Sequence, residues 1–204
     1  MNFKKVLFLG VALCFSTLTF AQEQAADCET DFSIYREAFK QWDGKTSSAN
    51  PIMIKSWRRV FLNCPNMKER THIDGAKIVN NALIRGTKDA ALKEKYIDTL
   101  IMVYNTRIQY FPNSQKGANQ IGNIKGRMGL DLMAFPSRLE QAYEALKEAV
   151  NIDGENSNYA FIDGYFSSVI QMVKAGKHDE SEIIEEYSKL MDIVDANIKK
   201  FTDL

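Results

Sequence analysis

Side chains suited to nucleophilic or metal chemistry are few in this chain. His72 and His178 are the only histidines in 204 residues, which excludes a metal site built from several imidazoles. Cys64 lies eight residues before His72, and a thiol activated by an imidazole can act as a nucleophile. However, Cys64 is better suited to a disulfide, and we expect His72 near an exposed helix start. We therefore predict no catalytic residue here.

Cys28 and Cys64 are placed to form a disulfide. Cys28 begins one predicted helix and Cys64 ends the next, and antiparallel helices bring the start of one beside the end of the other. A bridge would close a loop of about 37 residues and contribute roughly 3–4 kcal/mol in the chain-entropy model. The alternative is two free, buried thiols. We favour the bridge because residues 1–21 indicate export to an oxidising compartment.

Two short motifs match ligand-binding loops only in part. Gly44-Lys45-Thr46 resembles the end of a phosphate-binding loop, but Phe39 stands where that motif needs its first glycine. Residues 151–156 contain calcium-loop residue types, but the glycine is at the fourth place instead of the sixth. Both segments fit helix ends better. The sequence thus predicts no cofactor, no metal ion and no enzymatic activity.

The N-terminus has the pattern of a secretory signal peptide over residues 1–21. Lys4 and Lys5 precede an apolar run, and Thr19-Phe20-Ala21 provides a small-x-small cleavage site. The run is about 15 residues long, short of the roughly 20 that span a bilayer. We therefore expect a mature chain over 22–204, folded as one domain, with no transmembrane segment.

The charge balance excludes whole classes of partner. Lysine plus arginine equals aspartate plus glutamate, 26 against 26. Removing Lys4 and Lys5 with the signal peptide leaves 24 basic against 26 acidic residues, a formal charge of −2. A nucleic-acid binder needs a strong basic excess, so we expect no nucleic-acid partner.

The positions of glycine and proline between apolar segments predict about eight helices and an all-α fold. Each of the first seven segments with apolar residues at three- and four-residue steps ends at a glycine or a proline, which stop helices. Short connections make neighbouring helices antiparallel. The predicted helices cover about 29–43, 51–64, 69–85, 89–110, 119–134, 137–153, 157–175 and 179–201. They form pairs over about 29–64, 69–111, 119–153 and 157–201.

The second helix of three pairs repeats one register. Four positions recur in this helix, separated by four, three and five residues. The first is small or apolar, the second is large, the third is small or apolar, and the fourth is a glycine or proline that ends the helix. They are Ala142, Leu146, Ala149 and Gly154; Leu100, Tyr104, Arg107 and Pro112; Met53, Trp57, Val60 and Pro65. This pattern resembles the tetratricopeptide repeat (TPR), most clearly over residues 137–156. The resemblance implies helix hairpins stacked as a short right-handed superhelix that binds another chain on its concave surface.

Polar side chains mark a candidate binding surface on the helices over 69–85 and 119–134. They recur at helical spacing as Arg70, Asp74, Lys77, Asn81 and Arg85, and as Asn119, Asn123 and Arg127. Amides and guanidinium groups can bind a peptide backbone or a carboxylate. The alternative is a solvated convex side.

The last predicted helix, 179–201, carries a broad apolar stripe that includes Ile183, Tyr187, Leu190, Val194 and Ile198. Repeat arrays need a polar cap at their ends. We expect this edge to self-associate, to bind a partner or to continue into repeats missing from the chain.

Together with the signal peptide, the resemblance implies an extracytoplasmic protein of a Gram-negative bacterium, in the periplasm or associated with the outer envelope. The favoured function is a non-enzymatic scaffold that binds an unknown protein or peptide. The alternatives are a structural envelope subunit that assembles through its C-terminal helix, or a hydrolase with carboxylates in a groove.

Overall fold

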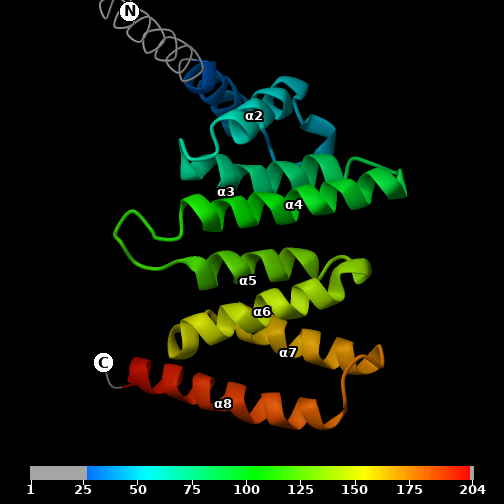
Figure 1. Ribbon diagram of the computed structural model, residues 1–204, viewed down its shortest axis with the longest axis vertical. Coiled ribbons are helices and arrows are strands. Elements are labelled where there is room, and N and C mark those ends of the chain that lie inside the picture. The colour runs from blue at the N-terminus through cyan, green and yellow to red at the C-terminus, as the bar shows by residue number, and fades with distance from the viewer. Residues whose placement is uncertain (1–26, 203–204) are drawn as a thin grey trace, which may run out of the picture. The chain divides into compact units, whose positions relative to one another are not determined.

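The computed structural model describes residues 27–202, with side chains described as far as Lys199. The predicted signal peptide, 1–21, lies outside these residues. Within them the chain is all-α, with eight α-helices packed as sequential antiparallel pairs, which confirms the predicted fold class (Figure 1). The chain divides into two compact units, one ending at Tyr96 and the other beginning at Ile97.

Unit 1 begins with a helix over 27–41, followed by α2 (Pro51–Asn63), α3 (Glu69–Lys77) and a π-helix, η2 (Ile78–Ile84). A short 3-10 turn, η1 (Thr46–Ser48), precedes α2. Proline starts α2 at its first turn, and the Asn50 side chain caps it by accepting from the N–H of Ile52 at 2.8 Å. The core of this unit contains Tyr35, Met53 and Trp57, all fully buried.

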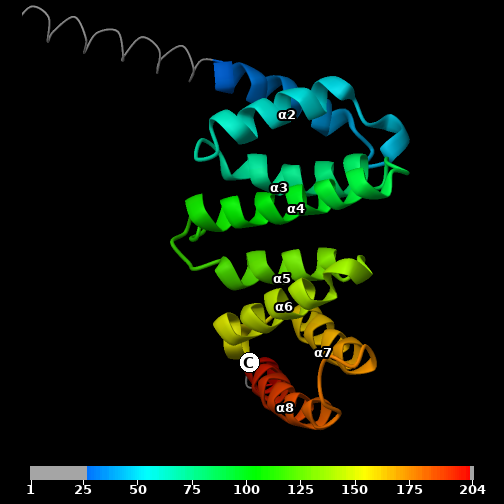
Figure 2. The same cartoon turned by 45° about the vertical axis from the view of Figure 1, so that its right-hand side comes forward.

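The disulfide between Cys28 and Cys64 is present, with 6.4 Å between the two Cα atoms, and this confirms the predicted bridge. It joins the start of the 27–41 helix to the residue after α2, so the two helices run antiparallel (Figure 2). Disulfides are typical of oxidising compartments. No helix in the described part of the chain is long and apolar enough to cross a membrane.

The predicted helix over 69–85 changes its winding halfway. It is α-helical to Lys77 and then a π-helix over Ile78–Ile84. In this wider segment the Thr46 hydroxyl donates to the carbonyl oxygen of Asn81 at 2.6 Å. A π-helix is a rare insertion in an α-helix, and the apolar period does not reveal it.

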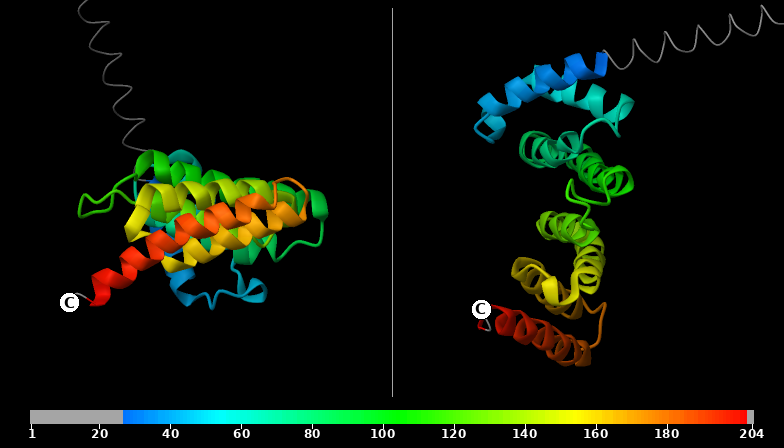
Figure 3. Two further views of the ribbon diagram at one scale, coloured as in Figure 1. Left: turned by 90° about the horizontal axis from the view of Figure 1, so that it is seen from below. Right: turned by 90° about the vertical axis from the view of Figure 1, so that its left-hand side faces the viewer.

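Unit 2 contains most of α4 (Ala90–Tyr110), then α5 (Ile121–Leu132), α6 (Leu139–Asp153), α7 (Tyr159–Lys174) and α8 (Ser181–Thr202). Two 3-10 turns, η3 (Pro136–Arg138) and η4 (Gly154–Asn156), flank α6. From α5 onward each helix packs on the next (Figure 3).

Glycines allow α5 to lie close to its neighbours. A Cβ at Gly129 would stand 2.5 Å from Cγ of Leu146 on α6, and a Cβ at Gly126 would stand 2.5 Å from the ring of Phe161 on α7. Atoms cannot approach this closely, so both positions need glycine. These two contacts therefore also determine which face of α5 points away from α6 and α7.

The first three positions of the repeated register are buried on all three helices. Ala142, Leu146 and Ala149 of α6 are inaccessible to solvent, and so are Leu100 of α4 and Met53 of α2. The register therefore marks the core side of these helices.

Candidate functional site

A groove of about 580 Å³ runs along α6 in unit 2. It is formed by Ile101 and Asn105 of α4, by Lys125, Met128 and Leu132 of α5, by α6 and the turn before it, and by Lys177. A second hollow of about 400 Å³ is lined by Asp98, Ile101, Met102, Asn105, Thr106, Gln109 and Gln141. The two share Ile101, Asn105 and Gln141, so they adjoin, and together we call them the α6 groove.

Three cations and four acids line the α6 groove, and each cation is paired with one of the acids. The Nζ of Lys125 lies 2.6 Å from Glu148, and the Nζ of Lys177 lies 2.9 Å from Glu140. Lys125 shows only 20% of its side-chain surface, whereas Glu148 shows 50%. The cation is therefore held deeper than its partner.

Arg138 repeats this arrangement at the beginning of α6. Its guanidinium donates to Asp98 at 2.7 Å and to Gln141 at 3.2 Å. Only 20% of the arginine side chain is exposed, against 62% of Asp98. The hydrogen bond from Lys177, together with its charge, lowers the pKa of Glu140, so this carboxylate is ionised at neutral pH.

The second hollow is lined mainly by uncharged polar groups. Asn105, Gln109 and Gln141 carry amides, which donate and accept hydrogen bonds. An amide row beside partly buried cations suits an extended peptide, because the amides can bind its backbone and the cations its carboxylates.

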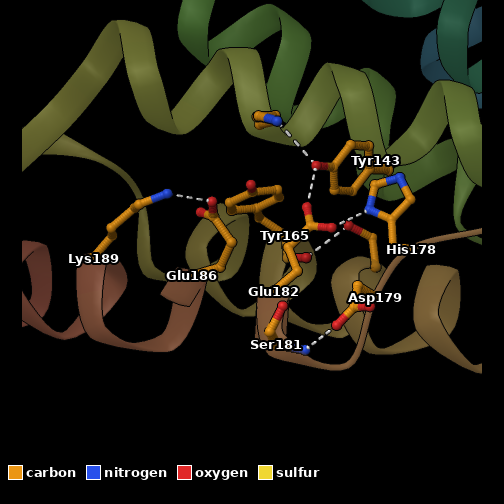
Figure 4. A network of polar contacts seen from close by, with 10 residues as sticks. Tyr143, Tyr165, His178, Asp179, Ser181, Glu182, Glu186 and Lys189 are labelled. Carbon is orange, nitrogen blue, oxygen red and sulfur yellow. Dashed lines mark hydrogen bonds and ion pairs between the residues drawn. The ribbon is translucent and has the colours of Figure 1, made fainter. Parts of the chain in front are cut away.

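A polar network behind the groove connects α6 to α8 (Figure 4). The Tyr143 hydroxyl donates to Glu182 at 2.9 Å and accepts from Lys147 at 3.0 Å. The other oxygen of Glu182 lies 2.6 Å from Nδ1 of His178, whose ring packs edge-on against Tyr143. Burial is the main reason that the pKa of Tyr143 is raised, so its hydroxyl keeps its proton at neutral pH.

A second part of the network lies one turn further along α8. Glu186 is buried and accepts from Lys189 at 2.7 Å. Burial would raise the pKa of Glu186, but Lys189 and the Tyr165 hydroxyl together lower it. Burial also raises the pKa of Tyr165. The network's glutamates both lie on α8 and bind partners within the fold, and neither lines the α6 groove.

The predicted binding residues of unit 1 are not all on the surface. Asp74 is fully buried and bound by Arg36 and by Arg70, whose Nε lies 3.0 Å away. Burial raises the pKa of Asp74, while the two guanidinium groups lower it. Asp74 therefore exposes no carboxylate on the surface described here, and its part in partner binding stays a prediction. The sequence gives no hint of this burial, because Arg36 lies 38 residues away.

The other predicted residues of this unit are accessible to different degrees. Lys77 and Arg85 are exposed, Arg70 is exposed beside Asp74, and Asn81 is half-buried in the π-helix. His72 is buried, contrary to expectation, and one ring nitrogen lies 2.7 Å from the carbonyl oxygen of Pro65. It is thus a core residue.

The predicted residues of unit 2 lie outside the α6 groove. Asn119 lies just before α5 and accepts from the N–H of Ile121 at 2.8 Å, and Asn123 accepts from Arg127 at 3.1 Å. Asn123 precedes Lys125 by two residues, which is about 200° around a helix. The stripe of Asn123 and Arg127 therefore lies on the other side of α5. A common groove with the unit 1 residues stays a prediction.

Sequence reasoning missed Lys125, Arg138 and Lys177. Their acidic partners come from other helices, between 23 and 40 residues away in the sequence, so no local pattern indicates the pairs. A weak signal exists on α6, where Glu140, Glu144 and Glu148 recur at four-residue steps.

Comparisons of the chain with protein-family models, with curated proteins and with solved structures find no match.

Proposed function

We propose that this protein is an exported, non-enzymatic helical scaffold that binds an extended, acidic protein segment in the α6 groove. One observation carries the proposal: Lys125 and Arg138 are held deep in the groove by acids that are themselves largely exposed. A carboxylate of a ligand can replace Glu148 or Asp98 without burying a new charge alone.

The three side-chain amides that line the second hollow support the same function. Asn105 and Gln141 line both hollows, Gln141 accepts from Arg138, and Gln109 lines the second hollow. All three offer hydrogen bonds to a peptide backbone. The buried register on α2, α4 and α6 is what a TPR-like scaffold needs, and such scaffolds bind other chains. The disulfide fits the proposed location outside the cytoplasm, in the periplasm or at the outer envelope.

The test is selection from a phage-displayed random peptide library on the immobilised protein. The chain is expressed with its own residues 1–21, so that the cell processes it. We expect enriched peptides to be rich in aspartate and glutamate. Lys125→Glu should weaken the binding of a selected peptide about tenfold or more, as measured by fluorescence polarisation. The reason is that the substitution replaces the attraction between Lys125 and an acidic side chain of the peptide by repulsion.

Arg127→Glu is the matched control. It makes the same charge reversal two residues away on the other side of α5. Binding lost with Arg127→Glu and kept with Lys125→Glu would assign recognition to the predicted polar stripe and overturn the groove. Equal melting temperatures of both variants would show that neither effect comes from unfolding. No enrichment over an unrelated helical protein would contradict peptide binding.

A further inference from the structure

The outer face of α8 is an apolar stripe beside two acids. Ile184, Tyr187 and Ile198 are exposed by 72%, 51% and 54%, and they recur at helical spacing along the helix. Asp192 and Asp195 are exposed on the same side. We call these five residues the α8 outer face. The inner side of α8 packs on the core of unit 2. Tyr187 also contacts the ring of Phe166 on α7, with 5.7 Å between ring centroids, and half of its surface stays exposed.

The outer face of α2 has the opposite charge. Ile52 and Leu62 are each exposed by 59%, and the exposed Lys55 and Arg58 lie between them. We call these four residues the α2 outer face. A shallow groove of about 390 Å³ runs along this helix from Pro51 to Asn63. The helix contains no acidic residue.

We propose that copies of this chain associate by packing the α8 outer face of one copy against the α2 outer face of another. Each face exposes aliphatic side chains that gain from burial. No described residue forms an ion pair with Lys55, Arg58, Asp192 or Asp195. Opposite charges on the two faces can therefore pair without breaking a contact inside either copy.

The spacing favours an antiparallel direction of the two helices. When α2 runs antiparallel to α8, Ile52 lies level with Ile198 along the helix axes, Lys55 with Asp195 and Arg58 with Asp192. Leu62 then lies beside Tyr187. Both apolar residues of the α2 outer face thus lie level with an apolar residue of α8, and both of its cations lie level with an aspartate.

The same residue spacing argues against a parallel arrangement of α2 and α8. If Lys55 and Arg58 meet Asp192 and Asp195 in parallel, Leu62 lies opposite Lys199. The antiparallel arrangement is also favoured by the two helix dipoles. The association uses two different surfaces, so it builds either a reciprocal dimer or a longer array. It does not involve the α6 groove.

The experiment is sedimentation velocity over a concentration series with the chain processed after expression. We expect a wild-type association that weakens as salt is raised, because exposed charges are screened. Two double variants are compared with it, K55E/R58E on α2 and D192K/D195K on α8. Each should weaken association by about tenfold or more, since two attractions become repulsions.

Mixing the two variants provides the decisive result. Each variant repels itself, but the reversed α2 face of one matches the reversed α8 face of the other. We expect the equimolar mixture to associate again with an affinity close to that of the wild type. Lys88→Glu, a charge reversal of an exposed lysine before α4, should leave association unchanged.

Three results would overturn the proposal. The first is a wild-type monomer at all concentrations up to the millimolar range. The second is association that survives K55E/R58E but not D192K/D195K, which would indicate that α8 packs against a surface other than α2. The third is a mixture that stays monomeric although both variants keep the wild-type melting temperature. None of these depends on whether the α6 groove binds a peptide.

Discussion

The indole ring of Trp57 lies directly against the backbone of Gly75. A Cβ at residue 75 would stand 2.6 Å from Nε1 of the indole and 2.8 Å from Cζ2. The ring cannot move aside easily, because Trp57 is buried and its Nε1 donates to the carbonyl oxygen of Thr71 at 2.9 Å. This contact joins α2 to α3, so the packing of unit 1 depends on it.

We therefore expect Gly75→Ala to destabilise the protein. Alanine favours a helix over glycine by about 1 kcal/mol. Overpacking of a core costs about 1–3 kcal/mol, and here the added carbon meets three atoms of one rigid ring. The free energy of unfolding should fall by about 1–2 kcal/mol overall, as measured by urea denaturation followed by tryptophan fluorescence.

Lys77→Ala is the control, because it adds no bulk and changes an exposed side chain of the same helix. It should shift the free energy of unfolding by no more than about 0.5 kcal/mol. A Gly75→Ala protein as stable as the wild type would mean that the indole can move away from residue 75.

The helices were predictable because their ends are local signals. Gly154 ends α6 and Gly176 follows α7, with φ of 51° and 67°, in the left-handed region that favours glycine. Asp89 was expected near a helix start, and its carboxylate accepts from the N–H of Leu92 at 3.0 Å. Such signals lie within a few residues of the feature that they specify.

The buried and paired charges could not be predicted in this way. Asp74 has the spacing of a surface stripe, yet its partner Arg36 comes from another helix. Lys125 is separated from Glu148 by 23 positions, so nothing near it in the sequence indicates a groove. Only the packing of one helix on another decides which side of a polar helix faces solvent.

The disulfide should contribute strongly to stability. It closes a separation of 36 residues, for which the chain-entropy model gives about 3–4 kcal/mol. We expect the double variant C28A/C64A to melt well below the oxidised wild type. Differential scanning calorimetry with and without a phosphine reductant measures this. The reductant should lower the melting temperature of the wild type only.

Intact mass spectrometry before and after alkylation tests the bridge itself. The oxidised protein should take up no alkylating agent at Cys28 or Cys64 until it is reduced. Labelling of both thiols in the native, untreated protein would contradict the bridge, and an unchanged melting temperature after complete reduction would contradict its contribution.

The hydroxyl of Tyr143 should hold α8 in place. It donates to Glu182 and accepts from Lys147, and a hydrogen bond to a charged group contributes about 1.5–3 kcal/mol when buried. Because Glu182 is partly exposed, we expect Tyr143→Phe to lower the free energy of unfolding by about 1–2 kcal/mol. Amides of α8 should exchange faster with solvent, as measured by hydrogen-exchange mass spectrometry.

Tyr159→Phe provides a matched control, since this tyrosine is 83% exposed. A double-mutant cycle with Glu182→Gln isolates the contact between α6 and α8. If the effects of Tyr143→Phe and Glu182→Gln simply add, the two side chains do not interact in solution.

Glu186 should make the protein sensitive to acid. Its pKa is lowered in the folded state by Lys189 and Tyr165, despite its burial. A carboxyl with a lowered folded-state pKa adds stability that is present above its unfolded pKa, about 4.3, and is lost as the pH falls through the folded-state value. We expect the wild type to exceed Glu186→Gln in melting temperature at pH 7 and to lose this advantage progressively below about pH 4.3.

Melting curves from pH 7 to pH 3 measure the difference between the two proteins. Glu180→Gln is the control, because Glu180 is exposed near the start of α8, and its difference from the wild type should stay constant with pH. The opposite trend for Glu186→Gln, with a wild-type advantage that grows as the pH falls, would mean that the folded state binds the proton more tightly than the unfolded chain. Burial would then outweigh Lys189 and Tyr165 in setting the charge of this glutamate.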